Sequence, residues 1–321
     1  MVKEPTSGGH AVAPEPATVR RPLGHWLLLA ALVAMWGSSF LFTKIAVAAM
    51  APASVVAGRL VLAAAVLGLV LVAARKPLAG GPRAWLFFLA IALIGNCVPF
   101  WLISWGQQRI DSGLAGILMA VMPMTTLVLA HFFVRGERLN GTRAAGFALG
   151  FLGVVALIGP DALLELRGTG TALLYELAVL GAAVLYAVNT IIARRRPAGD
   201  ALVAAAAVMI VASLIMVPAA WSRGTPWPTT IGAEAAMALA FLGLASTAAA
   251  TVVFFKLIAL AGPTFVSLIN YLIPVWAVLA GTIFLGERPE WAALGALVLI
   301  LAGIGLSEFR GRRGIAPSRP G

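Results

Sequence analysis

Four ionisable side chains stand inside segments that are otherwise apolar, and they are Lys44, Arg59, Glu176 and Lys256. A charge at mid-membrane costs about 2.5–3.5 kcal/mol on insertion scales, so each one needs a reason. The two lysines stand near segment ends and can extend to lipid headgroups. Arg59 stands deeper, and it either extends in the same way, pairs inside the protein or contacts an anionic group of a solute. Glu176 is either solvated at headgroup depth or, if it faces a cavity, a proton carrier, because desolvation favours the protonated carboxyl.

Uncharged polar and aromatic side chains gather near the middle of several apolar segments. Together with Arg59, the residues predicted to line a substrate site are Trp36, Ser38, Ser39, Asn96, Trp101, Asn189, Asn270 and Tyr271. Asn96 stands three residues before Pro99, and a proline frees a backbone carbonyl in the preceding turn. The alternative is that these small and polar residues only pack helices together and hydrogen-bond between them.

The sequence contains few residues that could carry out catalysis or bind a metal. The histidines and aspartates of the chain are His10, His25, His131, Asp111, Asp161 and Asp200. They form no clustered acid, base or metal set at membrane depth, and neither an HExxH pattern nor a GxxxxGK[ST] pattern occurs. Cys97 is the only cysteine, so an intrachain disulfide is excluded. We predict no enzyme activity, no metal, no cofactor and no direct use of ATP.

The composition is that of a protein embedded in lipid. Of the 321 residues, 61% are hydrophobic and only 11% are charged, and the mean hydropathy is +0.99. Runs of about 20 apolar residues match the length of membrane-spanning helices, and their internal Gly and Pro disfavour a barrel. We predict an all-α integral membrane protein with ten transmembrane helices at residues 25–48, 53–74, 84–106, 112–134, 143–160, 171–193, 200–220, 234–257, 263–285 and 290–307.

The basic residues alternate between the two sides of this predicted map. Of the 23 lysines and arginines, sixteen fall in the tails and loops of one side and four in the loops of the other. The positive-inside rule therefore places both termini in the cytoplasm and the protein in the cell (inner) membrane. The net charge of +11 is spread over short loops rather than one patch, so we predict no nucleic-acid partner.

The chain resembles itself at a shift of about 150 residues. GERLNGTRAAGFALGFLGV, from Gly136, aligns with GERPEWAALGALVLILAGI, from Gly286, and WGSSFLFTK (36–44) aligns with YAVNTIIAR (186–194). We therefore predict two five-helix repeats, at residues 24–160 and 161–307. A disordered cytoplasmic tail is expected at residues 1–23 and a basic cytoplasmic tail at residues 308–321.

An odd number of helices in each repeat makes the second repeat insert with the opposite orientation. Inverted repeats are typical of secondary transporters, in which the two halves rock around a central site. Pro123 and Pro274 correspond at a shift of 151 and are predicted to interrupt their helices as hinges. Gly146, Gly150 and Gly153, with Gly303 in the second repeat, form small-residue faces that serve helix packing or a homodimer.

The motifs WGSSFLFTK and AGRLVLAAAVL, the Pro123/Glu137 and Pro274/Glu287 pairs and the closing glycines resemble the EamA family of the drug/metabolite transporter superfamily. The resemblance implies a ten-helix fold that moves small metabolites, often amino acids and often outward. The second half departs from the first, because Tyr186 stands where the first has Trp36 and Met209 stands near the equivalent of Arg59.

These observations predict a secondary transporter that exports a small metabolite, such as an amino acid or a related amphipathic compound. Its partners would be the small-molecule substrate and the lipid bilayer. Two alternatives remain open, a membrane scaffold or sensor without transport activity and an intramembrane enzyme. A scaffold has no need of mirrored helix breaks, and an enzyme needs a catalytic cluster that the sequence lacks.

Overall fold

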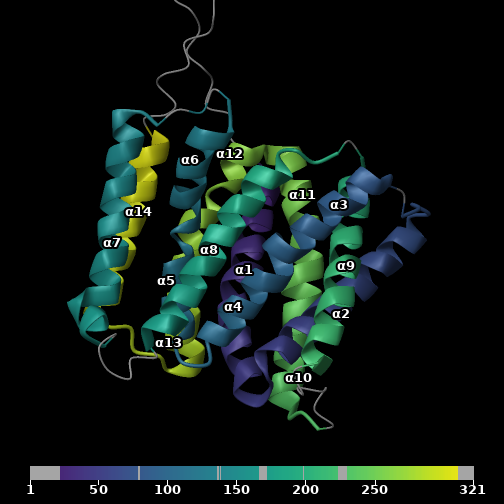
Figure 1. Cartoon of the computed structure of the whole chain (residues 1–321), viewed down its shortest axis with the longest axis horizontal. Coiled ribbons are helices and arrows are strands. Elements are labelled where there is room, and N and C mark those ends of the chain that lie inside the picture. The colour runs from purple at the N-terminus through teal and green to yellow at the C-terminus, as the bar shows by residue number, and fades with distance from the viewer. Residues whose placement is uncertain are drawn as a thin grey trace, which may run out of the picture.

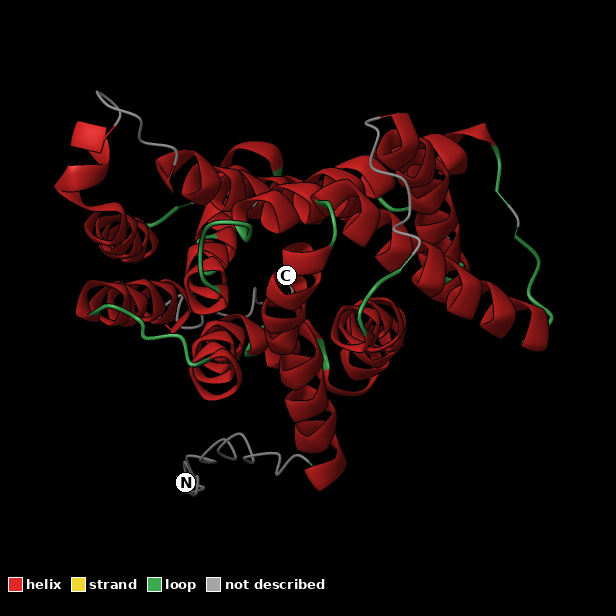
Figure 2. Cartoon of the chain, turned by 90° about the horizontal axis from the view of Figure 1, so that it is seen from below, coloured by secondary structure: helices red, strands yellow, loops and turns green. Residues whose placement is uncertain are grey.

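The computed structural model describes residues 22–78, 80–135, 137, 139–165, 172–197, 199–222 and 230–309, and all regular elements in these ranges are helical (Figures 1 and 2). In chain order they are α1 (Leu23–Ala49), α2 (Pro52–Ala73), α3 (Pro82–Ala92), η1 (Leu93–Cys97), α4 (Val98–Gly106), α5 (Ser112–Met119), α6 (Met122–Phe133), α7 (Gly141–Glu165), α8 (Ala172–Ala193), α9 (Ala201–Ser222), α10 (Ala233–Ala240), η2 (Phe241–Ala249), α11 (Ala250–Ala261), α12 (Pro263–Val266), α13 (Ile269–Leu285) and α14 (Trp291–Phe309).

Eight helical stretches in the described residues are long and apolar enough to cross a membrane, and two further apolar helices are shorter. The shorter ones are Ile269–Leu285 and Trp291–Ser307. The predicted all-helical membrane fold is therefore confirmed in its class. The predicted tails lie almost entirely outside the described residues.

Local sequence signals explain where several helices begin and end. Pro52, Pro82 and Pro263 stand at the start of α2, α3 and α12, where a helix needs no backbone donor and the fixed φ of proline fits. Asn140 Oδ1 accepts a hydrogen bond from the Arg143 backbone N–H at 2.9 Å and so caps α7. Gly286 ends α13 with φ +67°, a left-handed conformation that glycine adopts without strain.

The helices form a layered bundle with one outlying pair (Figure 1). α7 and α14 pack side by side at one edge, while α2, α9 and α3 pack together at the other. α1, α4, α8 and α13 fill the space between, joined by a core that includes Phe40, Ile103, Val179 and Ala277. We call the end of the bundle at which α1 begins and α14 ends the terminal face, and the other end the distal face.

The packing obeys the repeat that the sequence predicts. At the repeat shift, α1 is equivalent to α8, α2 to α9, η1 to η2, α4 to α11 and α6 to α13. α1 contacts α13 as α8 contacts α6, and α1 contacts η2 and α11 as α8 contacts η1 and α4. α2 contacts η2 as α9 contacts η1, and the equivalent pairs α2 with α9 and α7 with α14 pack on each other. Exchanging each element of one half for its equivalent therefore preserves these contacts.

Two predicted helices are broken, and the breaks only partly follow the prolines. α5 and α6 are separated at Ala120 and Val121, just before Pro123, where backbone bonds of the i→i+3 type replace the α pattern. In the second half the break lies at Ser267 and Leu268, and Pro274 sits inside α13. The prediction that Pro274 interrupts its helix is therefore wrong. A proline in the second turn removes one backbone hydrogen bond, and α13 continues without it.

A second pair of irregularities was not predicted from the sequence. The segment α3–η1–α4 contains π-helical residues Leu93–Cys97, and α10–η2–α11 contains π-helical residues Phe241–Ala249. At the repeat shift of 150 the first π segment falls inside the second. π-helical turns inside α-helices often occur at functional sites, because they widen the helix and redirect side chains.

Candidate functional site

Arg59 is a buried cation in the bundle interior, only 8% exposed, in the first half of α2. Its Nε donates a hydrogen bond to Thr247 Oγ1 at 2.7 Å, and its Nη2 donates one to Ser246 Oγ at 3.3 Å. Both hydroxyls lie on η2. No ion pair in the described part of the chain involves Arg59. Its charge is therefore solvated by neutral hydroxyl groups from the other half of the protein.

Two aromatic rings complete the surroundings of Arg59. The guanidinium carbon lies 3.8 Å from the centroid of the Phe100 ring on α4, a cation–π contact that contributes about 2 kcal/mol when desolvated. Phe100 in turn meets Tyr186 of α8 edge-on, with ring centroids 6.5 Å apart. Residues of α2, η2, α4 and α8 thus converge on one cation.

The two π segments hold their polar side chains in the same way. Asn96 Nδ2 on η1 donates to the carbonyl oxygen of Ile91 at 3.2 Å, and Thr247 Oγ1 on η2 donates to that of Leu242 at 2.7 Å. Each bond reaches back five residues, which is the spacing of a π turn. The π geometry therefore orients Thr247 so that its oxygen also accepts from Arg59.

Asn189, on α8 one turn after Tyr186, packs against η1. A Cβ on Gly95 would lie 2.5 Å from Asn189 Oδ1, so the glycine is what lets this side chain approach. Asn189 Oδ1 is buried and has no hydrogen-bond partner in the structure. A buried acceptor without a donor costs about 1–3 kcal/mol, so this oxygen is an unsatisfied group of the bundle interior.

The predicted residues of α1 divide between two roles. Trp36 Nε1 donates to the carbonyl oxygen of Ser246 at 3.1 Å and so ties α1 to η2 beside Arg59. Ser38 Oγ accepts from Trp276 Nε1 of α13 at 2.8 Å, and a Cβ on Gly37 would lie 2.5 Å from Trp276. Ser39 Oγ donates to the carbonyl oxygen of Trp36 within its own helix. Trp36 thus belongs to the Arg59 cluster, whereas Ser38 joins α1 to α13.

Three other predicted residues lie on α4 and α13. Trp101 packs on the core between α2 and α9 and stacks on Trp105 with ring centroids 6.2 Å apart. Tyr271 packs on the core of α5, α7, α13 and α14. Asn270 lies in the first turn of α13, close to the break in its helix.

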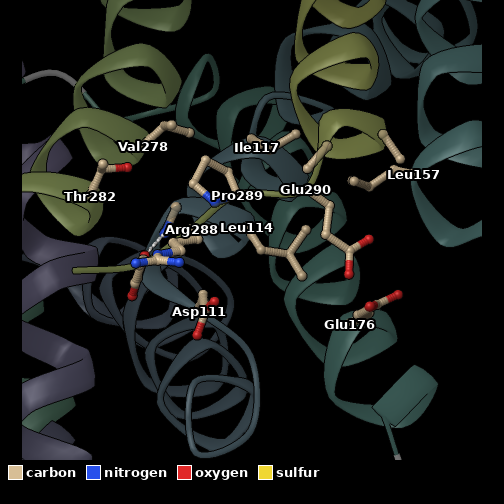
Figure 3. Close-up of a pocket in the computed structure, with 14 residues that line it drawn as sticks. Asp111, Leu114, Ile117, Leu157, Glu176, Val278, Thr282, Arg288, Pro289 and Glu290 are labelled. Carbon is tan, nitrogen blue, oxygen red and sulfur yellow. Dashed lines mark hydrogen bonds between the residues drawn. The ribbon is translucent and has the colours of Figure 1, made fainter. Parts of the chain in front are cut away.

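Glu176 lies far from this cluster, near the start of α8 at the distal face. It lines a cavity of about 230 Å³ whose other charged lining residues are Asp111, Glu287, Arg288 and Glu290 (Figure 3). The structure therefore places Glu176 at a cavity, as one of its predicted alternatives requires, but this cavity is a vestibule at one face.

Asp111 stands in the turn between α4 and α5 and lines the same vestibule. Its pKa is raised above the ordinary value, chiefly by burial and then by the charge of Glu287, while Lys44 acts in the opposite direction. Among the described residues no group of three or more His, Cys, Asp or Glu is arranged to hold a metal ion.

Sequence reasoning missed Ser246, Thr247, Phe100 and Trp276. The repeat itself carried a signal for two of them, because Asn96 and Cys97 correspond to Ser246 and Thr247 at the shift of 150. A polar residue in one half thus pointed to an equivalent polar residue in the other. Phe100 and Trp276 are apolar or aromatic residues in apolar helices, and nothing in the sequence separates them from ordinary core residues.

Known proteins match both halves of this arrangement. Residues 24–159 and residues 173–308 each match the EamA-like transporter family. The chain belongs to this family. The resemblance read from the sequence is therefore confirmed over both repeats.

Named relatives of this EamA-like protein cover most of its length. The uncharacterized inner membrane transporter YedA of Escherichia coli is 26% identical over 298 residues, 90% of this chain and 94% of that protein. The uncharacterized transporter YoaV of Bacillus subtilis is 25% identical over 286 residues, 86% and 93% of the two chains. Protein PagO of Salmonella typhimurium is 26% identical over 246 residues, 76% and 79%.

A solved crystal structure shares the fold. It superposes with a TM-score of 0.64 at 20% sequence identity and covers 91% of this chain and 99% of that one. The protein is thus a multi-pass membrane protein of a transporter family, with a two-repeat architecture and a polar cluster around Arg59 at the contact between the repeats.

Proposed function

We propose that this protein is a secondary transporter that exports a small amino acid or a related amphipathic carboxylate. In this proposal ten helices span the membrane, including the two shorter apolar ones, and the two repeats lie in opposite orientations. Both termini are cytoplasmic, so the distal face is the outer face. The repeats rock about the Arg59 cluster and expose it to each side in turn.

The observation that carries the proposal is the unpaired charge of Arg59. A cation buried in a bilayer without an anionic partner is unfavourable, and its two hydroxyl partners and one aromatic ring offset only part of that cost. A carboxylate is planar and accepts two parallel hydrogen bonds, which matches the guanidinium group. A substrate carboxylate would supply the missing countercharge.

Asn189 favours an amino acid over a simple organic acid. Its Oδ1 is a buried acceptor without a donor, and it lies one helical turn from Tyr186, which belongs to the Arg59 cluster. A substrate ammonium group could donate to this oxygen while the carboxylate meets Arg59. The surrounding rings of Trp36, Phe100 and Tyr186 would contact an apolar side chain.

Glu176 is the candidate for proton coupling. It lies in the distal vestibule, where a carboxyl group can exchange protons with the outer solution. A proton taken up there and released on the other side would couple the gradient to substrate movement. The pH dependence of substrate flux tests this role of Glu176.

The proposal is tested by counterflow in proteoliposomes. Vesicles holding the purified protein are loaded with a panel of unlabelled amino acids, and the uptake of each labelled amino acid is measured. Exchange of at least one amino acid by the wild type, and its loss in Arg59→Ala, are expected. Glu176→Gln should keep exchange at a fixed pH but abolish its response to a pH gradient. Absence of exchange for every carboxylate in the panel would overturn the proposal.

A further inference from the structure

Glu287, in the turn between α13 and α14, is hydrogen-bonded to the first turn of α5 at the distal face. Its carboxylate accepts hydrogen bonds from the Ser112 backbone N–H at 2.8 Å, Ser112 Oγ at 3.0 Å and the Gly113 backbone N–H at 3.0 Å. An anion at the start of a helix satisfies donors that the helix leaves open. Because Glu287 belongs to the second half and α5 to the first, these bonds tie the halves together.

The surrounding backbone is shaped to admit this carboxylate. A Cβ on Gly281 of α13 would lie 2.1 Å from Glu287 Oε2 and 2.7 Å from Ser112 Oγ. The Glu287 backbone N–H donates to the Gly281 carbonyl oxygen at 3.2 Å, which holds the turn back against α13. The carboxylate therefore occupies a notch that α13 and α5 form together and that any larger side chain at Gly281 would fill.

The equivalent glutamate at the terminal face has a different partner. Glu137, at the repeat shift of 150, pairs with Arg194 just beyond the end of α8, with Oε1 2.5 Å from Nη1. The equivalent of Arg194 is Lys44 on α1, which instead donates to the carbonyl oxygen of Ile110 at 2.7 Å. At each face two kinds of partner are thus available to the glutamate, the start of a short helix (α5 or α12) or a cation (Lys44 or Arg194). Glu287 uses the helix, and Glu137 uses the cation.

The packing of the half-helices shows the same difference. α5 is in close backbone contact with α1, α8 and α13. Its equivalent α12 has its most extensive backbone contact with α11, and its Phe265 and Val266 pack on Leu29, Leu32 and Val33 of α1. α5 is therefore packed against the other half more extensively than α12 is, while the halves are in contact at both faces.

The first residues of α5 and α12 also differ in the hydrogen-bond donors that they offer. α5 begins at Ser112 and α12 begins at Pro263, a shift of 151 that Pro123 and Pro274 also show. Proline has neither a backbone N–H nor a hydroxyl group. Two of the three donors that hold Glu287 therefore have no counterpart for Glu137 at the terminal face.

We propose that Glu287 is a latch that closes the distal face and that Pro263 prevents an equally strong latch at the terminal face. The resting protein is then held more firmly at the distal face than at the terminal face, where the ion pair of Glu137 with Arg194 also joins the halves. This inference rests on the proposed function in one respect: with cytoplasmic termini, the face that opens more readily is the cytoplasmic one, from which an exporter takes its substrate. Opening the distal face requires Glu287 to leave α5.

The latch is tested by a distance measurement that does not depend on transport. Spin labels are placed on exposed Gln108 of the first half and exposed Trp291 of the second, in a Cys97→Ser background, and the distance distribution is recorded in lipid. Wild type should give one short distance. Glu287→Gln, which removes the charge and puts an amide N–H against one of the two backbone donors, should raise the ratio of long to short distances on the order of tenfold.

Matched variants separate the latch from a general charge effect. Glu290→Gln removes a carboxylate from the same turn and the same vestibule, and it should leave the distance distribution unchanged. Glu137→Gln, the repeat-equivalent change, should not lengthen the distal distance. Ser112→Ala removes one of the three donors and should give a smaller increase than Glu287→Gln. Pro263→Ser restores donors at the terminal face and should favour the long distal distance.

Each outcome decides the proposal. An unchanged distance in folded Glu287→Gln protein, or an equal increase in Glu290→Gln, overturns the latch, whether or not counterflow is observed. A longer distance in Glu287→Gln and Pro263→Ser, with unchanged controls, supports it. If the distances shift as stated but no carboxylate is exchanged by the wild type, the latch holds and the proposed function fails.

Discussion

Arg59 in α2 and Met209 in α9 hold equivalent positions in the two halves, and both are buried. One is a cation bonded to hydroxyl groups of η2, and the other is part of an apolar core. Ser112 and Pro263 differ in the same way at the helix starts. The repeat supplies a common scaffold, and in our proposal substrate binding and the resting state depend on the positions at which the two halves differ.

The largest effect should come from making the halves alike at the cation. Arg59→Met removes two charge-assisted hydrogen bonds to the protein and the proposed contact with the substrate. At about 1.5–3 kcal/mol for each hydrogen bond to a charged group, transport efficiency should fall on the order of 100-fold or more. Initial rates of counterflow across a substrate series measure this. Met209→Leu conserves volume at the equivalent position and should change transport less than twofold, roughly; a similar loss in both variants would contradict the difference in role.

Asn189→Ala should separate amino acids from other carboxylates. If Asn189 Oδ1 accepts from a substrate ammonium group, its loss should weaken amino acid exchange about tenfold, the effect of one hydrogen bond to a charged group. Acids that lack the amino group should be exchanged as well as by the wild type. Competition assays with matched pairs of amino acid and deaminated acid give the comparison. Equal losses for both members of each pair would assign Asn189 to helix packing.

Thr247→Val tests whether the π segment serves Arg59. The hydroxyl accepts from Arg59 Nε and donates to the Leu242 carbonyl, so its removal leaves a charged donor without a partner. Exchange should fall about threefold to tenfold, and Thr247→Ser should restore it. Thr251→Val is the control, because Thr251 bonds only the backbone of its own helix in the structure. Comparable losses at both positions would indicate a general effect on η2.

The smallest effect concerns pH at the latch. Burial and Glu287 raise the pKa of Asp111, while Lys44 lowers it, and Glu176, Arg288 and Glu290 line the same vestibule. As pH falls through that raised pKa, Asp111 becomes neutral and its repulsion of Glu287 disappears, so the closed distal state gains population. Above that pKa the repulsion is fully present.

Spin-label distances recorded from neutral pH toward the ordinary aspartate range measure this pH effect. Asp111→Asn should make the closed fraction independent of pH over that range. A closed fraction that instead falls on mild acidification, with Asp111 intact, would contradict this role of Asp111.

Much of the fold could be predicted because the sequence patterns that specify it extend over many residues. Apolar runs of about 20 residues, alternating basic loops and a register held over both repeats are redundant, and the family match over residues 24–159 and 173–308 agrees with them. Arg59 could also be predicted, since a charge in such a run is conspicuous. These features depend on residue type and order alone.

The site was only partly predictable because its geometry depends on helix irregularity. The π segments do not have a sequence signature as strong as that of a proline, so Ser246 and Thr247 read as ordinary small residues of an apolar helix. The error at Pro274 was the opposite one, because a helix break was predicted there. α13 continues through this proline, and the break lies before it at Ser267 and Leu268. The partner of Glu287 lies 175 residues away on α5, and only the packing of the halves reveals it.

The most direct test of the account is whether the substrate must carry a carboxylate for Arg59. Proteoliposomes of the wild type and of Arg59→Lys are assayed by counterflow with each exchanged amino acid and with its carboxamide, which keeps the size and the ammonium group. The account predicts that the wild type exchanges the acids and excludes the carboxamides, and that Arg59→Lys, which keeps the charge but loses the planar fork, exchanges the acids more weakly. Exchange of acids and carboxamides at equal rates by the wild type would contradict it.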